Sequence, residues 1–338
     1  MKRKILKVFN FFLFLTIGIV LLYLAFKGVD FNSLVDDLKS ANYYWVLLSL
    51  LFAFVGYVSR AFRWKLLIEP LNYNPPVKNV FYALMFGYLA NFAFPRIGEI
   101  SRCGSLTKSD KIPMDSLIGT VIIERAIDLV VLLFFLFVVF VAKIESFGLF
   151  IKNNVFIPIS KKIISVVDFP FYYWLVIIIV IGTTIGLFYY FRKRFKRVRI
   201  IIKIRKIIRG VISGVKTVSK MRSRKAFLFH TFVIWLMYFL MTYVIVFSIP
   251  STSNLTPIDG LFLLVIGGLG MAAPVQGGIG AFHWIVTAAL SLYGISREDG
   301  LVFATIQHES QAVLAILLGS FSILMLFLNS RRNRKNNI

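Results

Sequence analysis

Residues 91–99 read Asn-Phe-Ala-Phe-Pro-Arg-Ile-Gly-Glu, so a helix breaker and two charged side chains directly follow an apolar run. That run, 80–94, has about 15 residues. A helix of this length reaches about 22 Å, whereas the hydrocarbon core of a bilayer is about 30 Å thick. Pro95 ends the helix because proline lacks an N–H and disfavours helical backbone at the residue before it. Broken backbone at this depth must be buried in protein or line a wet cavity, so we predict the tip of a re-entrant hairpin and a site there.

The composition indicates an integral membrane protein. Hydrophobic residues make up 58% of the chain, the mean hydropathy is +0.80, and several apolar runs approach the length of a membrane span. The formal net charge of +24 could suggest a nucleic-acid partner. The basic residues, however, lie mostly between apolar runs, as the positive-inside rule requires, so we expect no nucleic acid. The single cysteine, Cys103, excludes an intramolecular disulfide and a cysteine-based metal site.

The remaining apolar runs predict full membrane spans on both sides of this hairpin. We expect spans over 8–26, 45–67, 117–142, 171–191, 226–249 and 301–328. A second hairpin is predicted where two short apolar stretches, 260–273 and 281–293, flank Pro274-Val-Gln-Gly-Gly-Ile-Gly. The segment after the first span is expected to be an outer loop that carries Asp30, Asp36, Asp37 and Lys39.

The distribution of Lys and Arg sets the orientation. Residues 192–225 contain fifteen Lys or Arg and no acidic residue, and apolar residues recur there at helical spacing. This pattern predicts an amphipathic helix on the anionic inner leaflet. Four basic residues before the first span and four after the last one predict a multi-pass protein of the cell (inner) membrane with both termini in the cytoplasm.

The same elements recur in the same order in both halves, but the second half starts from the opposite side. We therefore predict an all-α polytopic membrane protein of two inverted repeats, each with full spans and a re-entrant helical hairpin. The single transmembrane domain, 1–338, would comprise repeat 1 at 1–142, an outer connection and the first span of repeat 2 at 143–191, the basic segment at 192–225 and the remainder of repeat 2 at 226–338. Many secondary transporters have this architecture and bind substrate at broken helices near the midplane.

The hairpin tips are expected to favour an anion. Free N–H groups at the starts of their second helices carry partial positive charge, and Arg96 adds a fixed charge. Gly98, Gly277 and Gly278 would let a phosphate or carboxylate headgroup approach the backbone. Alternatively, the glycines only let helices pack closely, and Arg96 pairs with Glu99 or an acidic residue of the next span as a structural lock.

Ionisable residues within the span 117–142 form a second candidate site. Glu124, Arg125 and Asp128 lie on one predicted helix, and charges inside a membrane mark functional sites. Glu124 and Asp128 are four residues apart and share a face, so their carboxylates repel unless a cation or a proton lies between them.

The basic end of the span 45–67 has a simpler explanation. Arg60 and Arg63 are expected to snorkel to lipid phosphates at the cytoplasmic surface, and Trp64 suits the aromatic belt of the interface. None of the three is therefore a predicted site residue.

Three residues of the second half, His283, His308 and Glu309, have side chains that can ligate metals. Their spacing in the sequence matches no common metal-binding motif, so we expect intramembrane hydrogen bonds, with no metal and no cofactor. Proton coupling through Glu124, Asp128 or His308 stays open.

Four blocks of sequence occur in an informative order: Arg60-Ala-Phe-Arg-Trp, Asn91 with Pro95-Arg-Ile-Gly-Glu-Ile-Ser-Arg, Glu124-Arg-Ala-Ile-Asp, and Pro274-Val-Gln-Gly-Gly-Ile-Gly. They resemble the membrane region of lysylphosphatidylglycerol synthases, whose free-standing relatives are called flippase-like proteins. The resemblance implies a lipid-translocating module that moves a headgroup between leaflets. It assigns these positions to the family's central site: Asn91, Arg96, Glu99, Arg102, Glu124, Arg125 and Asp128.

The sequence departs from the family pattern near its C-terminus. His283 follows the glycine motif where an acidic residue is expected, and His308 stands where arginine is frequent. The candidate substrate-binding set is completed by Gly98, Gln276, Gly277, Gly278, His283, His308 and Glu309. The sequence ends at Ile338 without the soluble domain that transfers an aminoacyl group in the synthases, so we expect no synthesis of lysylphosphatidylglycerol and no enzymatic activity.

These inferences favour a carrier for a phospholipid or another amphiphile with an anionic headgroup, so the expected partners are membrane lipids. Arg96 and the helix dipoles would hold the anion, and Glu124, Arg125 and Asp128 would switch partners between inward and outward states. One alternative is a membrane glycosyltransferase with a lipid-linked donor, against which stand the short outer loops and the absence of an Asp-x-Asp pair. Another is a non-transporting scaffold whose basic loop recruits a partner.

Overall fold

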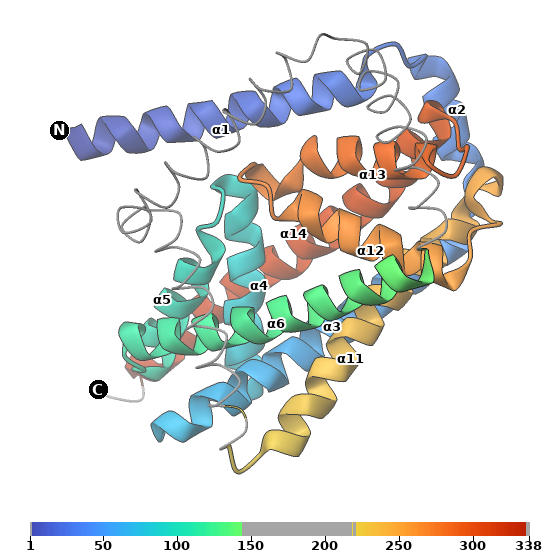
Figure 1. Cartoon of the computed structure of the whole chain (residues 1–338). Coiled ribbons are helices and arrows are strands. Elements are labelled where there is room, and N and C mark those ends of the chain that lie inside the picture. Colours follow the sequence, from blue (N-terminus) through green and yellow to red (C-terminus); the bar gives the residue numbers. More distant parts are fainter. Residues whose placement is uncertain (1, 144–217, 219–220, 336–338) are drawn as a thin grey trace, which may run out of the picture. The chain divides into compact units, whose positions relative to one another are not determined.

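The computed structural model describes residues 2–143, 218 and 221–335 (Figure 1), and the regular structure in this part of the chain is helical. The chain divides into two compact units, residues 1–125 with 216–338 and residues 126–215. The α-helices are α1 (Lys2–Phe26), α2 (Phe31–Ser40), α3 (Tyr43–Ile68), α4 (Val77–Ala93), α5 (Gly98–Asp110), α6 (Met114–Ala142), α11 (Arg224–Tyr243), α12 (Pro257–Met271), α13 (Ala281–Ser291) and α14 (Arg297–Lys335). The predicted connection and span at 143–191 and most of the basic segment at 192–225 lie outside the described residues.

Four helical segments in the described part of the chain are long and apolar enough to cross a membrane. They are Tyr43–Leu71, Met114–Ala142, Arg224–Ser248 and Arg297–Leu328. They confirm four of the helical spans that the lengths of the apolar runs predict. At the predicted first span, α1 carries a shorter apolar segment, Leu15–Phe26.

On helix α3, several leucines are exposed, while small and hydroxyl-bearing residues are buried. Leu47 and Leu51 are 67% and 56% exposed, whereas Ala53 is fully buried. The hydroxyl of Ser49 donates to the carbonyl of Met241 at 2.7 Å, across the interface with α11, which runs beside α3 in Figure 1. Small and hydroxyl-bearing side chains thus join the two helices, as is common between helices in membranes.

The helix break predicted at Pro95 is confirmed. Helix α4 ends at Ala93, Phe94 is extended with φ −142° and ψ 131°, and Arg96 has a left-handed φ of 61°. Helix α5 then packs against α4. With 17 and 13 residues, both helices are shorter than the roughly 20 residues that cross a bilayer, so the pair has the dimensions of the predicted hairpin.

Two glycines bring α4 and α5 together. A Cβ atom on Gly98 would lie 2.3 Å from the carbonyl oxygen of Gly87. The side chain of Asn91 accepts the N–H of Gly98 at 2.8 Å, so α4 caps the start of α5. The N–H of Gly98 therefore already has an acceptor within the protein. The start of α5 offers fewer free N–H groups to an anion than predicted from the sequence.

The second helix break is longer than the first. Helix α12 ends at Met271 and α13 begins at Ala281. Between them lie the 3-10 turn η5 (Gln276–Gly278) and three glycines with positive φ, Gly277, Gly278 and Gly280. Pro274 lies seven residues before α13 begins, so it does not start that helix. Re-entry of the two hairpins into the membrane and their inverted relation remain predictions.

Helix α2 replaces the loop that the sequence analysis expects after the first span. Its polar residues suggest a loop, yet four apolar residues recur at helical spacing: Phe31, Leu34, Val35 and Leu38. Lys39 pairs with Asp36, one turn away, at 3.2 Å. The helical pattern was therefore present in the sequence, but it extends over only 10 residues.

We expect Gly98→Ala to destabilise the protein, because its Cβ atom would overlap backbone that cannot move without separating α4 from α5. Overpacking of this kind costs about 1–3 kcal/mol. Gly104→Ala on the same helix is the control, since no atom lies within 4 Å of its added Cβ. Thermal unfolding of the purified variants in detergent measures both, and equal stability would contradict the close contact.

Candidate functional site

Glu124 of α6 is almost fully buried, at 1% exposure, and lies among three buried arginines. Arg60 of α3 and Arg102 of α5 each donate to its carboxylate, the latter at 3.0 Å. The guanidinium group of Arg63 lies 3.5 Å from the same carboxylate. Because a buried carboxylate must be paired, this ion cluster holds α3, α5 and the start of α6 together.

The ion cluster corrects the prediction made for the end of α3. Arg60 and Arg63 do not snorkel to lipid phosphate, because both side chains are buried against Glu124. Trp64 is also buried, and its indole N–H donates to the hydroxyl of Thr120 at 2.9 Å. The sequence contained one signal for this arrangement, since a carboxylate within a membrane span needs a positive partner from another helix.

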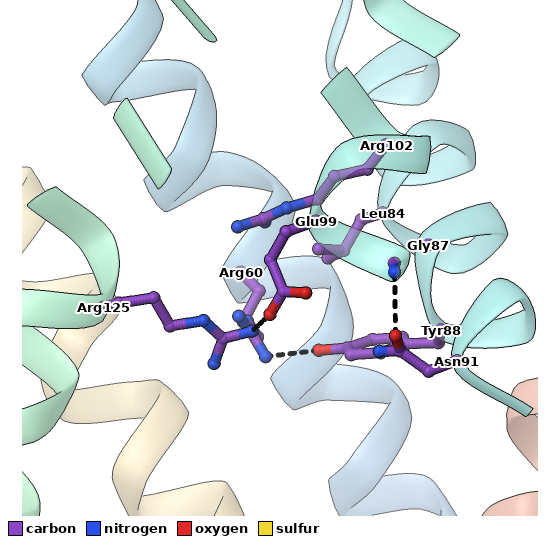
Figure 2. A pocket seen from close by; sticks show the side chains of 9 residues that line it. Arg60, Leu84, Gly87, Tyr88, Asn91, Glu99, Arg102 and Arg125 are labelled. Atoms are coloured by element: carbon purple, nitrogen blue, oxygen red, sulfur yellow. Dashed lines mark hydrogen bonds and ion pairs between the residues drawn. The ribbon is translucent and has the colours of Figure 1, made fainter. Parts of the chain in front are cut away.

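A small, partly open pocket adjoins the ion cluster. Residues of α3, α4, α5 and α6 line it: Arg60, Leu84, Gly87, Tyr88, Asn91, Gly98, Glu99, Arg102 and Arg125. In Figure 2, Arg125 and Glu99 point toward each other, with their charged groups 2.8 Å apart, and Arg60 donates to the hydroxyl of Tyr88. Three guanidinium groups and one carboxylate therefore line the pocket, a composition suited to an anion.

Arg102 brings a buried hydrogen-bond donor to this pocket. Its Nη2 donates to Glu124, and its guanidinium carbon lies 4.4 Å from the ring centroid of Trp64. Its Nη1 is buried and has no hydrogen-bond partner among the described residues. A buried donor without an acceptor costs about 1–3 kcal/mol, and more when it is charged. Arg102 thus combines a place in the pocket lining with a donor that no described residue satisfies.

Arg96 links the two helix breaks. Its guanidinium donates to the carbonyl of Ala272 at 2.8 Å, at the C-terminal end of α12. The partner that the structure gives Arg96 is therefore a backbone carbonyl instead of an acidic side chain. The carbonyl end of a helix carries partial negative charge, so the contact stabilises the end of α12.

The glycines of the second break are packed against protein. A Cβ atom on Gly277 would lie 2.5 Å from the ring of Phe92, and one on Gly278 would lie 2.5 Å from the sulfur of Met271. Gln276 beside them is buried as well. These contacts favour the explanation that the glycines allow close packing, because Phe92 and Met271 fill the space that a headgroup would need.

Three further predicted residues form a cluster of their own. His283, His308 and Glu309 come together on α13 and α14, and none of them lines the pocket. Asp128 follows Glu124 by four residues in α6 and belongs to the second compact unit. The predicted central site thus divides into an arginine pocket and a histidine cluster.

Comparisons with known proteins identify the family of the chain. The profile of the family described as the lysylphosphatidylglycerol synthase TM region matches residues 11–319. A UPF0104 membrane protein of Methanocaldococcus jannaschii is 32% identical over 143 residues, which cover 41% of this chain and 42% of that relative. The chain thus matches less than half of the relative's length. No solved structure matches the chain significantly.

We expect Glu124→Gln to destabilise the protein by about 3–5 kcal/mol, because it leaves buried guanidinium groups beside a neutral amide. Glu99→Gln removes the same charge from an ion pair whose side chains are 33% and 48% exposed. That change should cost less than about 1 kcal/mol. Unfolding temperatures in detergent compare the two variants, and similar losses would show that Glu124 is not the counter-ion on which this cluster depends.

Proposed function

The chain belongs to the family of lysylphosphatidylglycerol synthase transmembrane regions, and we propose that it is a carrier that moves lipids with an anionic headgroup between membrane leaflets. Its apolar helices and this family make it a multi-pass membrane protein. The observation that carries the proposal is the buried Nη1 of Arg102, which has no acceptor among the described residues and belongs to a side chain that lines the pocket with two further arginines.

The pocket suits the phosphate of a lipid headgroup. A guanidinium group donates in a planar fork that matches two oxygens of a phosphate, and such charge-assisted bonds are among the strongest in proteins. The pocket is small in the described conformation, so a headgroup enters it only when the side chains that line it move apart. In this proposal the headgroup enters the pocket while the acyl chains remain in the bilayer.

The ion pair between Arg125 and Glu99 is the part of the site that a headgroup can open. Both side chains are partly exposed, in contrast to the buried contacts of Glu124. A phosphate that binds Arg125 replaces the carboxylate of Glu99 with another anion, so the charge on Arg125 stays paired throughout. Exchange of partners at Arg125 then couples headgroup binding to movement of α5, which carries Glu99.

The two broken helix pairs are the elements that we propose to move. Discontinuous helices surround the substrate site in many secondary transporters. The contact from Arg96 to Ala272 joins the two breaks in the described conformation. Release of this contact would let the pairs separate and open the pocket to the other leaflet.

We further propose that the chain acts without catalysis, in the inner membrane, with both termini in the cytoplasm. The fifteen basic residues within 192–225 and the basic residues after the last apolar run support this orientation.

A leaflet-exchange assay with purified protein in liposomes tests the proposal. Fluorescent phosphatidylglycerol and phosphatidylcholine are compared by chemical bleaching of the outer leaflet. We expect the protein to accelerate exchange of phosphatidylglycerol above empty liposomes and above phosphatidylcholine. Arg125→Gln should reduce this rate about tenfold or more, because it removes a charge-assisted bond to phosphate worth about 1.5–3 kcal/mol.

Lys65→Gln is the matched control for charge. Lys65 lies on α3, 4.0 Å from Glu69, and does not line the pocket. This variant should retain exchange at the rate of the unmodified protein. Failure of the unmodified protein to exchange either lipid, or equal rates for Arg125→Gln and Lys65→Gln, would contradict the proposal.

A further inference from the structure

A second polar cluster lies on α13 and α14, away from the arginine pocket. His283 and His308 are 2% and 5% exposed, and Glu309 is half-exposed. Their metal-ligating atoms all lie within 4.8 Å of one another. We propose that these three residues bind a divalent transition-metal ion of the Zn²⁺ class. The proposal is independent of lipid movement and replaces the expectation, drawn from spacing along the sequence, that no metal binds.

His308 has the supporting hydrogen bond that metal-binding histidines need. Its Nε2 lies 2.9 Å from the carbonyl oxygen of Gly277. A carbonyl can only accept, so Nε2 carries the proton and donates it. Nδ1 is then left to face Glu309, at 2.9 Å. Histidines that ligate metals almost always donate their other ring N–H to a carbonyl or carboxylate in this way.

Nδ1 of His308 and the carboxylate of Glu309 are both hydrogen-bond acceptors when neither carries a proton. Their close approach therefore requires a proton or a metal ion between them. A proton would satisfy this pair. Nε2 of His283, however, lies 3.6 Å from the same Oε1 atom, beyond hydrogen-bond distance. Ligand atoms around a tetrahedral zinc ion lie about 3.3 Å apart, given bonds of roughly 2.0–2.1 Å. The two separations from Glu309, 2.9 and 3.6 Å, bracket this value, and all three ligand atoms lie within 4.8 Å of one another. A modest approach of the two histidine rings would therefore let one ion bind all three atoms, whereas a proton joins only two.

The chemistry of the donors selects the kind of ion. Imidazole nitrogen suits zinc, cobalt, nickel and copper, whereas magnesium and calcium prefer oxygen ligands. Two histidines and one glutamate leave one position of a tetrahedron for water or a small anion, as in zinc sites that exchange a ligand. Glu309 is the exposed member of the cluster, so the site is open on its side.

The two histidines differ in how well the protein supports them. Nδ1 of His283 is buried and has no hydrogen-bond partner among the described residues. It therefore lacks the supporting bond that Gly277 gives to His308. Because loss of such support weakens metal affinity about 10–100-fold, we expect His308 to contribute more to binding than His283.

Titration of the full-length protein with Co²⁺ in detergent tests the proposal. The protein carries a purification tag without histidine and is first stripped with a chelator. We expect one Co²⁺ per chain, the visible absorption of a low-coordinate nitrogen and oxygen site, and displacement of Co²⁺ by Zn²⁺. Binding of Co²⁺ that is no tighter than to a protein-free detergent sample would overturn the proposal.

Variants locate the ion, and the third histidine of the chain is the matched control. His308→Asn should weaken Co²⁺ binding most, by about 100-fold, and His283→Asn and Glu309→Gln by about tenfold or more. His230→Asn should leave binding unchanged, because His230 lies on α11 and contacts Ser59. Unfolding temperatures of the metal-free variants show that each is folded. Equal binding by the His230 and His308 variants would overturn the assignment, as would binding lost only with His230.

Discussion

The constraint on which the first unit depends is the burial of the carboxylate of Glu124. Neither lipid nor bulk water can neutralise a charge at 1% exposure, so its partners must come from other helices. Arg60 and Arg102 meet that need from α3 and α5. Arg102 also brings a buried donor without a partner in the described part of the chain to the pocket. Changing Arg102 would therefore alter stability and binding together, whereas the partly exposed Arg125 reports on binding alone.

Two side chains donate to backbone carbonyls of the second helix break. Arg96 donates to Ala272 at the end of α12, and His308 donates to Gly277 in the second break. Carbonyl groups freed by a broken helix need donors when water is excluded, and these contacts supply them. The same contacts cross between separate elements. The carbonyl groups of a broken helix thus form contacts with side chains that are distant in the sequence. A ligand or metal that binds those side chains could change the contacts.

Apolar run length and helix breakers predicted much of the fold, because they are local properties. Four spans and the break at Pro95 are confirmed. The resemblance supplied the family and pointed to Arg102 and Glu124, which do lie together. The ion pairs between helices could not be predicted, because the sequence separation of two residues on different helices does not show whether they are in contact. For that reason Arg60 was assigned to lipid phosphate, and the meeting of His283 with His308 was not foreseen.

The most direct test of the account is an electron cryo-microscopy map of the protein in nanodiscs of phosphatidylglycerol. It tests both the ion cluster and its link to an anionic headgroup in one measurement. We expect Glu124 in contact with Arg60 and Arg102, and density for a phosphate within hydrogen-bond distance of Arg102 and Arg125. A map in which Glu124 contacts neither arginine, or in which the pocket is closed and lipid phosphates lie only on the outer surface of the helices, would contradict it.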